Sequence, residues 1–494
     1  MNYGILSIVI LYQLLTILGV AYYLMQKHRL YKGEKDSFTH AGHGLSVPAI
    51  AMTLALTVLG AVHIIGVFEK TWVLGAGVIW FSFASVILLC VVCLATGRWV
   101  RRLGIATVPE LLERGYGLET RLTVSCVMIG SIFGIITLEA QGLGVLLFSM
   151  TGWSIPVGGA VGAGLGILYV IFAGMREISW LNIINAVVMY IALILAVIFI
   201  GFALPGNGYE TAAQVHRDAG NARLLNPFGD VGVIFAFGIP IVIAIVFSQS
   251  TSQMLLQTAM SAKTEKTLLR SMWIAAPVNG MFAVLATLLA LAAMSVPEFA
   301  ELGSKVATTE MLVSLLPPWL SGLLLAAFAG VILSTFAMTA LASSTLFATD
   351  IYKRLYRPDA TDAQVTWATR IMIVILGSIS AVLAGFMPPI LSGVAWLLAW
   401  LTPVFWVVIF GLFWKRNQPV AITALIVSWI LNSAWTFTPL PEWVGLVGVH
   451  NAYVTFLTGL VIMVVGILFF GGRPGMMKDE TLIQQRPAAM SQAE

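Results

Sequence analysis

Long apolar segments recur along the whole of this chain, and they constrain its fold more than any other feature. As a helix, a segment of about 20 apolar residues crosses the ~30 Å hydrocarbon core of a bilayer. A spanning segment must also satisfy its own backbone hydrogen bonds, which favours helices over strands here. Only 10% of the residues are charged, whereas about a quarter are charged in soluble domains. We therefore predict an all-α integral membrane protein.

About thirteen transmembrane helices are expected from segment lengths, and the short loops between them leave no room for a soluble domain. The predicted spans are 4–26, 47–67, 71–97, 122–150, 155–175, 181–203, 231–256, 271–294, 319–349, 367–388, 392–414, 420–437 and 453–471.

Lysine and arginine are distributed very unequally between the two sides of these spans. Of the 26 Lys and Arg residues, only Lys70, Arg217, Arg223 and Lys305 fall in one set of loops. Because cytoplasmic loops collect Lys and Arg, the chain should begin outside the cell and end in the cytoplasm. We expect a plasma membrane location, as in a bacterial inner membrane. The basic residues lie in scattered short loops, which argues against a nucleic-acid partner.

The segment 107–121, TVPELLERGYGLETR, is amphipathic rather than spanning. Thr107 and Glu110 match a capping box, and Pro109 falls in the first turn, where proline is tolerated. We predict a short helix on the cytoplasmic surface. A plain polar loop is the alternative.

Two ionisable side chains are predicted to lie deep in the membrane, where such groups are costly and usually functional. Glu139 lies in the middle of the span 122–150, and His63 lies in the span 47–67. We expect Glu139 to act on substrate or protons. The alternative is a protonated acid that only bonds a neighbouring helix, and for His63 a structural role is equally open. Gln141 is two residues from Glu139, on a different part of the helix surface.

The span 319–349 is dense in small and hydroxyl residues, as helices are where they pack closely. Within it, Val331, Ser334 and Thr335 are spaced i, i+3, i+4 and share one face. A backbone carbonyl with two hydroxyls forms a partial oxygen cage suited to a hard monovalent cation. The face carries no full negative charge, which suits an ion that must bind and leave.

A run of six polar residues, 248–253, falls towards the end of the span 231–256. Such a run is hard to place against lipid and fits a helix that borders a water- or substrate-filled cavity. An early exit of the chain into the cytoplasm is the alternative.

Four segments, in order, resemble the sodium:solute symporter family. They are GIATVPELLERGYG, YVIFAGMREISWLNIINAVVM, LSTFAMTALASSTLFATDIYKRL and GLFWKRNQPVAITALIVS. The third is the most specific, since it resembles the family's serine-rich helix that ends in an Asp-Ile-Tyr-Lys type of sequence.

The resemblance implies a leucine-transporter-like fold, in which five helices are repeated with inverted topology. The repeats would occupy 47–203 and 204–414, and the additions would be 1–46, with one helix, and 415–494, with two helices and a short tail. The second and seventh helices would be broken near the midplane. The resemblance also implies a sodium site made by the carbonyls of Leu56, Leu59 and Val331 and the hydroxyls of Ser334 and Thr335.

One departure from the family pattern concerns a second sodium site. Family members often carry Thr-Asp, and then Gln three residues after the Asp, early in the sixth helix. The corresponding residues here are Leu181, Asn182 and Asn185, so the acid is missing. The hydroxyls one turn beyond Ser334 are also missing, because Ala337 and Met338 occupy those positions. We expect one sodium ion per substrate.

The resulting prediction is sodium-coupled uptake of a small polar organic solute by alternating access. The alternatives are proton coupling through Glu139 and His63, or a transporter-like membrane sensor. We expect no catalytic residues, no cofactor other than the co-transported sodium, and no obligate protein partner. The expected substrate-lining residues, which suit a solute with amine or hydroxyl donors, are His63, Glu139, Gln141, Gln249, Ser250 and Gln253.

Overall fold

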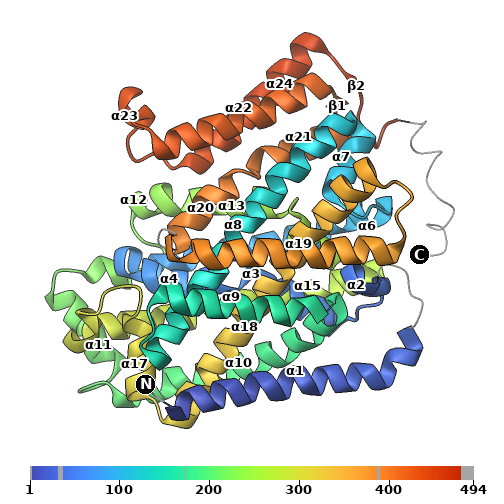
Figure 1. Ribbon diagram of the computed structural model, residues 1–494. Coiled ribbons are helices and arrows are strands. Elements are labelled where there is room, and N and C mark those ends of the chain that lie inside the picture. Colours follow the sequence, from blue (N-terminus) through green and yellow to red (C-terminus); the bar gives the residue numbers. More distant parts are fainter. Residues whose placement is uncertain (1–2, 32–36, 173, 387–389, 480–494) are drawn as a thin grey trace.

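The computed structural model describes residues 3–31, 37–172, 174–386 and 390–479, and this part is almost entirely helical (Figure 1). Eleven helices in it are long and apolar enough to cross a membrane, and Val47–Val58 and Ile155–Ile171 are shorter apolar helices. The prediction of an all-α integral membrane protein is confirmed. The predicted count of thirteen spans is consistent with these helices and stays a prediction.

The first part of the chain forms ten helices. They are α1 (Tyr3–Tyr31), α2 (Ser37–His40), α3 (Val47–Val58), α4 (Ala61–Leu74), α5 (Ile79–Val91), α6 (Gly97–Leu103), α7 (Val108–Tyr116), α8 (Leu118–Thr151), α9 (Ile155–Phe172) and α10 (Met175–Ala203). A π-helical turn, Val92–Thr96, joins α5 to α6 without a break.

The second part begins with helices on the loop 204–230 and ends with a helical hairpin. Its helices are α11 (Tyr209–Asp218), α12 (Val231–Val233), α13 (Ile239–Gln249), α14 (Gln253–Met260), α15 (Glu265–Ser295), α16 (Pro297–Ala300), α17 (Ala307–Leu315), α18 (Pro318–Leu346), α19 (Asp362–Leu383), α20 (Ile390–Ala399), α21 (Thr402–Phe413), α22 (Gln418–Phe437), α23 (Leu440–Trp443) and α24 (Asn451–Phe470). A π-helical segment, Phe347–Tyr356, continues α18. Two short strands, β1 (Lys415–Arg416) and β2 (Arg473–Pro474), pair antiparallel.

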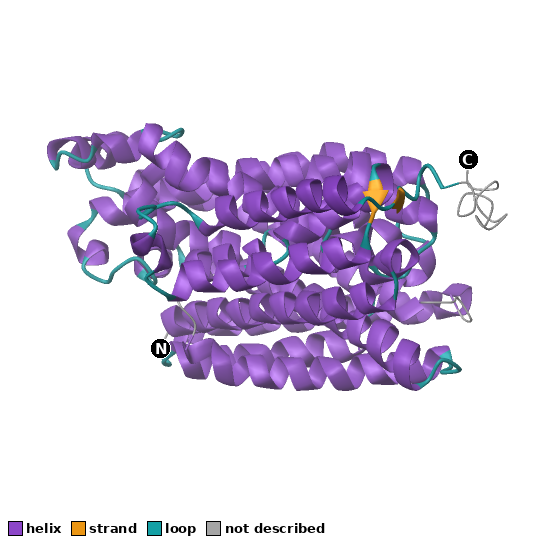
Figure 2. Ribbon diagram, turned by 90° about the horizontal axis from the view of Figure 1, so that it is seen from above, coloured by secondary structure: helices purple, strands orange, loops and turns teal. Residues whose placement is uncertain are grey.

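Most of the long helices run side by side (Figures 1 and 2). Helix α18 lies at the centre of the bundle, since 94% of the residues in the most apolar stretch of Pro318–Tyr356 are buried. Helix α1 lies along one edge of the bundle beside α10, and α22 pairs with α24 at the opposite edge (Figure 1).

The two ends of the bundle carry different elements. Helices α2, α6 and α7 and both strands lie at one end, and α11, α17 and α23 lie at the other (Figure 1). The loops that are rich in Lys and Arg belong to the first end, as the predicted alternation requires. We call it the basic end.

Breaks interrupt three of the spans. Helix α3 stops before Leu59–Gly60 and α4 starts after it, α13 and α14 flank Ser250–Ser252, and α20 and α21 flank Trp400–Leu401. Each break leaves backbone donors and acceptors that are not used within a helix, so each can bind a ligand inside the membrane.

Several span boundaries differ from the predictions. Helix α4 continues to Leu74, and the next span runs from Ile79 to Leu103 rather than over 71–97. Gly75 makes the turn between them, with φ of +56° and with the Leu224 carbonyl 2.1 Å from where a Cβ would lie. The span 392–414 is two helices rather than one. Hydropathy marks neither turn, because the chain stays apolar on both sides of it.

Candidate functional site

Thr335 lies between two backbone carbonyls that belong to different helices. Its Oγ1 donates to the Leu56 carbonyl at 2.8 Å and is 3.1 Å from the Val331 carbonyl. The Ser334 Oγ donates to the same Val331 carbonyl at 3.1 Å. The break after α3 thus meets the hydroxyl face of α18, and four of the five predicted sodium-site residues contact one another.

Leu59, the fifth of these residues, lies in the break itself. Its amide donates to the Leu56 carbonyl at 3.1 Å, which closes the last turn of α3. All five residues are buried. Carbonyls in the last turn of a helix carry the negative end of its dipole, which favours a cation there. The arrangement therefore offers a hard cation only oxygen ligands and no carboxylate.

Glu139 caps the helix on the other side of the same break. Its Oε2 accepts from the Ala61 amide at 2.7 Å, at the start of α4. Gly60 cannot be replaced easily, because a Cβ there would lie 2.4 Å from the Glu139 carboxylate. A buried acid at the positive end of a helix satisfies an amide that would otherwise lack a partner. The carboxylate of Glu139 thus holds the broken helix at its midpoint.

His63 lies in the first turn of α4 and is fully buried. Its Nε2 is 3.3 Å from the Ser85 Oγ, and its ring lies 4.2 Å from that of Phe81, centroid to centroid. Its Nδ1 has no hydrogen-bond partner among the described residues. One ring nitrogen is therefore available to a bound molecule.

Several polar atoms at the second break also lack partners in the described part of the chain. They are both amide atoms of Gln249 and the hydroxyls of Ser250 and Ser252. These side chains are buried among the helices. Buried polar groups nearly always have partners. Unpartnered atoms at a helix break indicate a place where a ligand or water is bound.

Two of the predicted substrate residues are already engaged. The Gln253 Oε1 accepts from the Val108 amide, and its Nε2 donates to the Ala106 carbonyl, both at 3.1 Å. Its side chain thus bonds the loop before α7. Gln141 is buried on α8, two residues along from Glu139, and it also takes part in a polar interaction.

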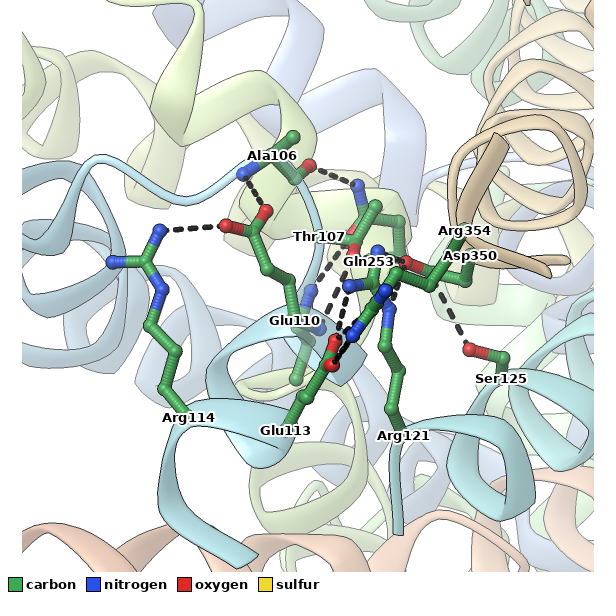
Figure 3. A network of polar contacts seen from close by, with 11 residues as sticks. Ala106, Thr107, Glu110, Glu113, Arg114, Arg121, Ser125, Gln253, Asp350 and Arg354 are labelled. Atoms are coloured by element: carbon green, nitrogen blue, oxygen red, sulfur yellow. Dashed lines mark hydrogen bonds and ion pairs between the residues drawn. The ribbon is translucent and has the colours of Figure 1, made fainter. Parts of the chain in front are cut away.

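A polar network closes the basic end above these groups (Figure 3). Asp350, at the end of the central helix, accepts from Arg121 at 2.5 and 2.9 Å, from Thr107 at 2.8 Å and from Ser125 at 3.1 Å. Asp350 and Arg121 are both buried. Together with Gln253 they join α7, α8, α14 and the end of α18.

Glu113 extends the network towards the surface. It bonds Arg121 at 2.5 Å and Arg354 at 2.6 Å. The Arg354 guanidinium, with help from Arg121, holds the pKa of the Glu113 carboxyl below its ordinary value. These ion pairs therefore contribute stability above the ordinary pKa of a glutamate. They lose it only as the pH falls through the lowered pKa.

The predicted cap of α7 is confirmed. The Thr107 hydroxyl accepts from the Glu110 amide at 3.2 Å, and Glu110 reaches back to the Ala106 amide at 2.9 Å. The helix is thus fixed at the point where it supports the network, and the plain-loop alternative is wrong.

Three buried charged residues were not recognised from the sequence as site residues. Glu69 is 7% exposed in α4, and its Oε2 accepts from the Ile390 amide at 2.9 Å. It was missed because the predicted span ended at residue 67. Arg121 was counted only as a loop charge, and Asp350 only as part of a family motif. Both residues lie at the ends of apolar segments, and nothing in the sequence indicates that their side chains form an ion pair.

Two amide side chains, Asn182 and Asn185, stand where the family resemblance would place the acid and the glutamine of a second sodium site. Asn182 is fully buried, and neither of its amide atoms has a partner among the described residues. The Asn185 Oδ1 accepts from the Tyr12 hydroxyl of α1 at 2.9 Å.

Comparisons with known proteins identify the family of this chain. Residues 38–428 match the model of the sodium:solute symporter family. An Escherichia coli protein described as an uncharacterized symporter, YidK, is 24% identical over 92% of this chain and 82% of its own length. A sodium/proline symporter of Haemophilus influenzae is 26% identical over 67% of this chain and 68% of its own.

A solved structure shares the fold. It is a sodium-coupled sialic acid symporter in a substrate-bound, outward-open state, with a TM-score of 0.75 and 18% identity, covering 93% of this chain and 98% of that one. At this identity the likeness shows the leucine-transporter-like fold alone. The family match, over most of the chain, shows more: this protein belongs to the sodium:solute symporter family and is a sodium-coupled solute transporter, not an enzyme.

Proposed function

We propose that sodium is carried at the first break, by the carbonyls of Leu56, Leu59 and Val331 and the hydroxyls of Ser334 and Thr335. The contact of Thr335 with the Leu56 carbonyl supports this most directly, since it brings oxygens of α3 and α18 within 2.8 Å of each other. When the ion binds, the Thr335 proton turns away and both oxygens face the cation. The site then joins two helices, so that sodium stabilises their contact.

The solute is proposed to bind beside this ion, between the two helix breaks. The observation that carries the proposal is the set of buried polar atoms without described partners on His63, Gln249 and Ser250. Glu139 and Gln141 would complete the lining. Gln253 would join it only when the basic end opens, because its amide is bonded to the loop before α7.

The solute class follows from what already occupies the start of α4. In this fold the positive ends of half-helices can hold the anionic group of a substrate. Here the carboxyl group of Glu139 takes that position and already accepts from the Ala61 amide, so this amide is not available to the anionic group of a solute. We therefore propose a neutral or cationic solute that presents hydroxyl or amine donors.

Uptake would run by alternating access across the plasma membrane, with the basic end in the cytoplasm. The network around Asp350 would be the closed inner gate. Proton coupling is the second candidate, because Glu139 is an acid bonded to the broken helix at its midpoint.

A thermal-stability screen of the purified protein tests the solute proposal. The panel contains neutral sugars and polyols, amines and monocarboxylates, each with sodium and with potassium. We expect a sodium-dependent stabilisation by a neutral or cationic member. Stabilisation by carboxylates alone would overturn the proposed class, and the same response in potassium, varying with pH, would favour protons.

A further inference from the structure

An apolar groove of about 800 Å³ runs between α1 and the core of the transporter. Its walls come from α1, α8, α9, α10, α18 and α19. It is separate from the sodium and solute groups, and nothing in the proposed transport cycle uses it. Along α1 the lining runs from Leu6 to Met25. At 1.5 Å per residue this is about 28 Å, close to the thickness of the hydrocarbon core.

The lining of the groove changes from apolar to basic at the basic end of the bundle. Arg176 and Arg370 line that end, beside Thr366 and Phe38. The Arg370 guanidinium lies 5.1 Å from the centre of the Phe38 ring, and its Nε has no partner among the described residues. Arg176 donates to the Ala41 carbonyl and adds positive charge. Glu177 also lines this end, but its carboxylate caps α10 through the Gly174 amide.

A buried hydroxyl lies between the apolar and the basic parts. Tyr169 lines the groove, is 6% exposed, and its hydroxyl has no partner in the described part of the chain. A buried tyrosine hydroxyl normally finds a hydrogen-bond acceptor. Tyr169 is three residues from the end of α9 at Phe172, which is about 4.5 Å along the helix.

We propose that this groove binds an anionic phospholipid from the leaflet at the basic end. Its acyl chains would lie against α1 and α9, an ester carbonyl would accept from the Tyr169 hydroxyl, and the phosphate would contact Arg370. The long apolar wall and the two arginines at its basic end match the acyl chains and the anionic headgroup of a phospholipid. Basic pockets between helices are the known form of such sites in other membrane proteins.

The groove reaches the helix that carries the proposed sodium face. Ala329 and Leu333 line it, and Val331 lies between them on α18. Successive residues of a helix point in different directions, so the lipid would pack behind the face that binds the ion. The lipid would support α18 from the membrane side.

Lipid binding to the purified full-length protein tests the proposal without any transport assay. The probes are dioleoylphosphatidylglycerol and dioleoylphosphatidylcholine, titrated in detergent and followed by native mass spectrometry. We expect the anionic lipid to bind wild type more tightly. Arg370→Gln should weaken it about fivefold, as loss of one basic contact implies, and should weaken phosphatidylcholine less, because its cationic choline offsets the charge of the phosphate. Tyr169→Phe should weaken both lipids, because both carry glycerol esters.

Arg357→Gln is the matched control, since Arg357 is an exposed residue at the same end and does not line the groove. Equal binding of the two lipids to wild type would overturn the proposal. So would an equal loss in Arg357→Gln and Arg370→Gln, which would indicate general surface charge. Competition by glycerol phosphate at low concentration would show a site for free phosphate instead. Because no sodium or solute is present, none of these outcomes depends on the proposed ion site.

Discussion

The single hydroxyl of Thr335 contacts carbonyls of both α18 and the last turn of α3. Ion binding at the proposed site depends on this one side chain. Its neighbour Thr339 also carries a buried hydroxyl, but that group donates to the Thr335 and Phe336 carbonyls within its own helix. The two threonines differ in what they join rather than in burial. A matched pair of substitutions can therefore separate ion binding from packing.

Thr335→Ala should raise the sodium concentration needed for half-maximal uptake by roughly tenfold, the cost of one polar contact. Thr335→Ser, which keeps the hydroxyl, should stay close to wild type, and Thr339→Ala should change sodium dependence little. Uptake into proteoliposomes measures all three. An unaltered sodium dependence in Thr335→Ala would remove the assignment of the site.

Glu139 combines a cap and a titratable group, and two substitutions separate them. Glu139→Gln keeps an oxygen for the Ala61 amide but cannot bind or release a proton, whereas Glu139→Leu loses both functions. We expect Glu139→Gln to insert normally and to lose most uptake or change its pH profile. Glu139→Leu should also lower stability by about 1–3 kcal/mol, the cost of leaving a buried amide unpaired. If Glu139→Gln transported like wild type at every pH, Glu139 would have only a structural role as the cap of α4.

At the scale of elements, the helices at the basic end are joined by ion pairs that differ greatly in how deeply they are buried. Arg121 and Asp350 are buried and join α8 to the end of α18, whereas Arg114 and Glu110 form an exposed pair within α7. Removing one partner of a buried pair leaves an uncompensated charge and is strongly destabilising. An exposed pair within one helix contributes a few tenths of a kcal/mol.

Arg121→Gln should therefore open the basic end, and Arg114→Gln should not. Amide hydrogen exchange measures this directly at residues 106–110, whose backbone bonds Gln253 and Glu110. We expect exchange there to be faster by tenfold or more in Arg121→Gln, because the loss of a buried partner costs several kcal/mol. Equal protection in the two variants would show that the network does not close this end.

At the scale of the whole molecule, one ion per solute must supply the energy of uptake. Moving one charge through about 100 mV yields ~2.3 kcal/mol, and a tenfold sodium gradient adds roughly 1.4 kcal/mol. Together these support accumulation of a neutral solute on the order of 500-fold. One sodium ion is thus sufficient for scavenging a nutrient.

We expect a sodium-to-solute flux ratio of one, measured from the reversal potential in proteoliposomes. The reason is that Asn182 replaces the family's acid, and that Ala337 and Met338 offer no side-chain oxygen. Asn182→Asp tests the same point, since restoring the acid should raise the ratio or the apparent sodium affinity. A ratio of two in wild type would reveal a second ion site built from other residues.

The all-helical membrane fold and the approximate spans could be predicted from local composition, because each span satisfies its own backbone and must be apolar over the thickness of the bilayer. The family was predicted from the resemblance of four segments. The sequence also predicted the cap of α7 and the shared face of Val331, Ser334 and Thr335, since both depend on residues within one or two turns.

The contacts between side chains of different helices could be known only from the three-dimensional structure. The carboxylate of Glu139 is bonded to an amide 78 residues away, and Arg121 is bonded to Asp350 across 229 residues. No local pattern encodes such partners, because a helix fixes the direction of its own side chains and not the identity of its neighbours. The turn at Gly75 was hidden for a related reason. Its position is set by the Leu224 carbonyl that passes against it, and the apolar pattern continues across the turn.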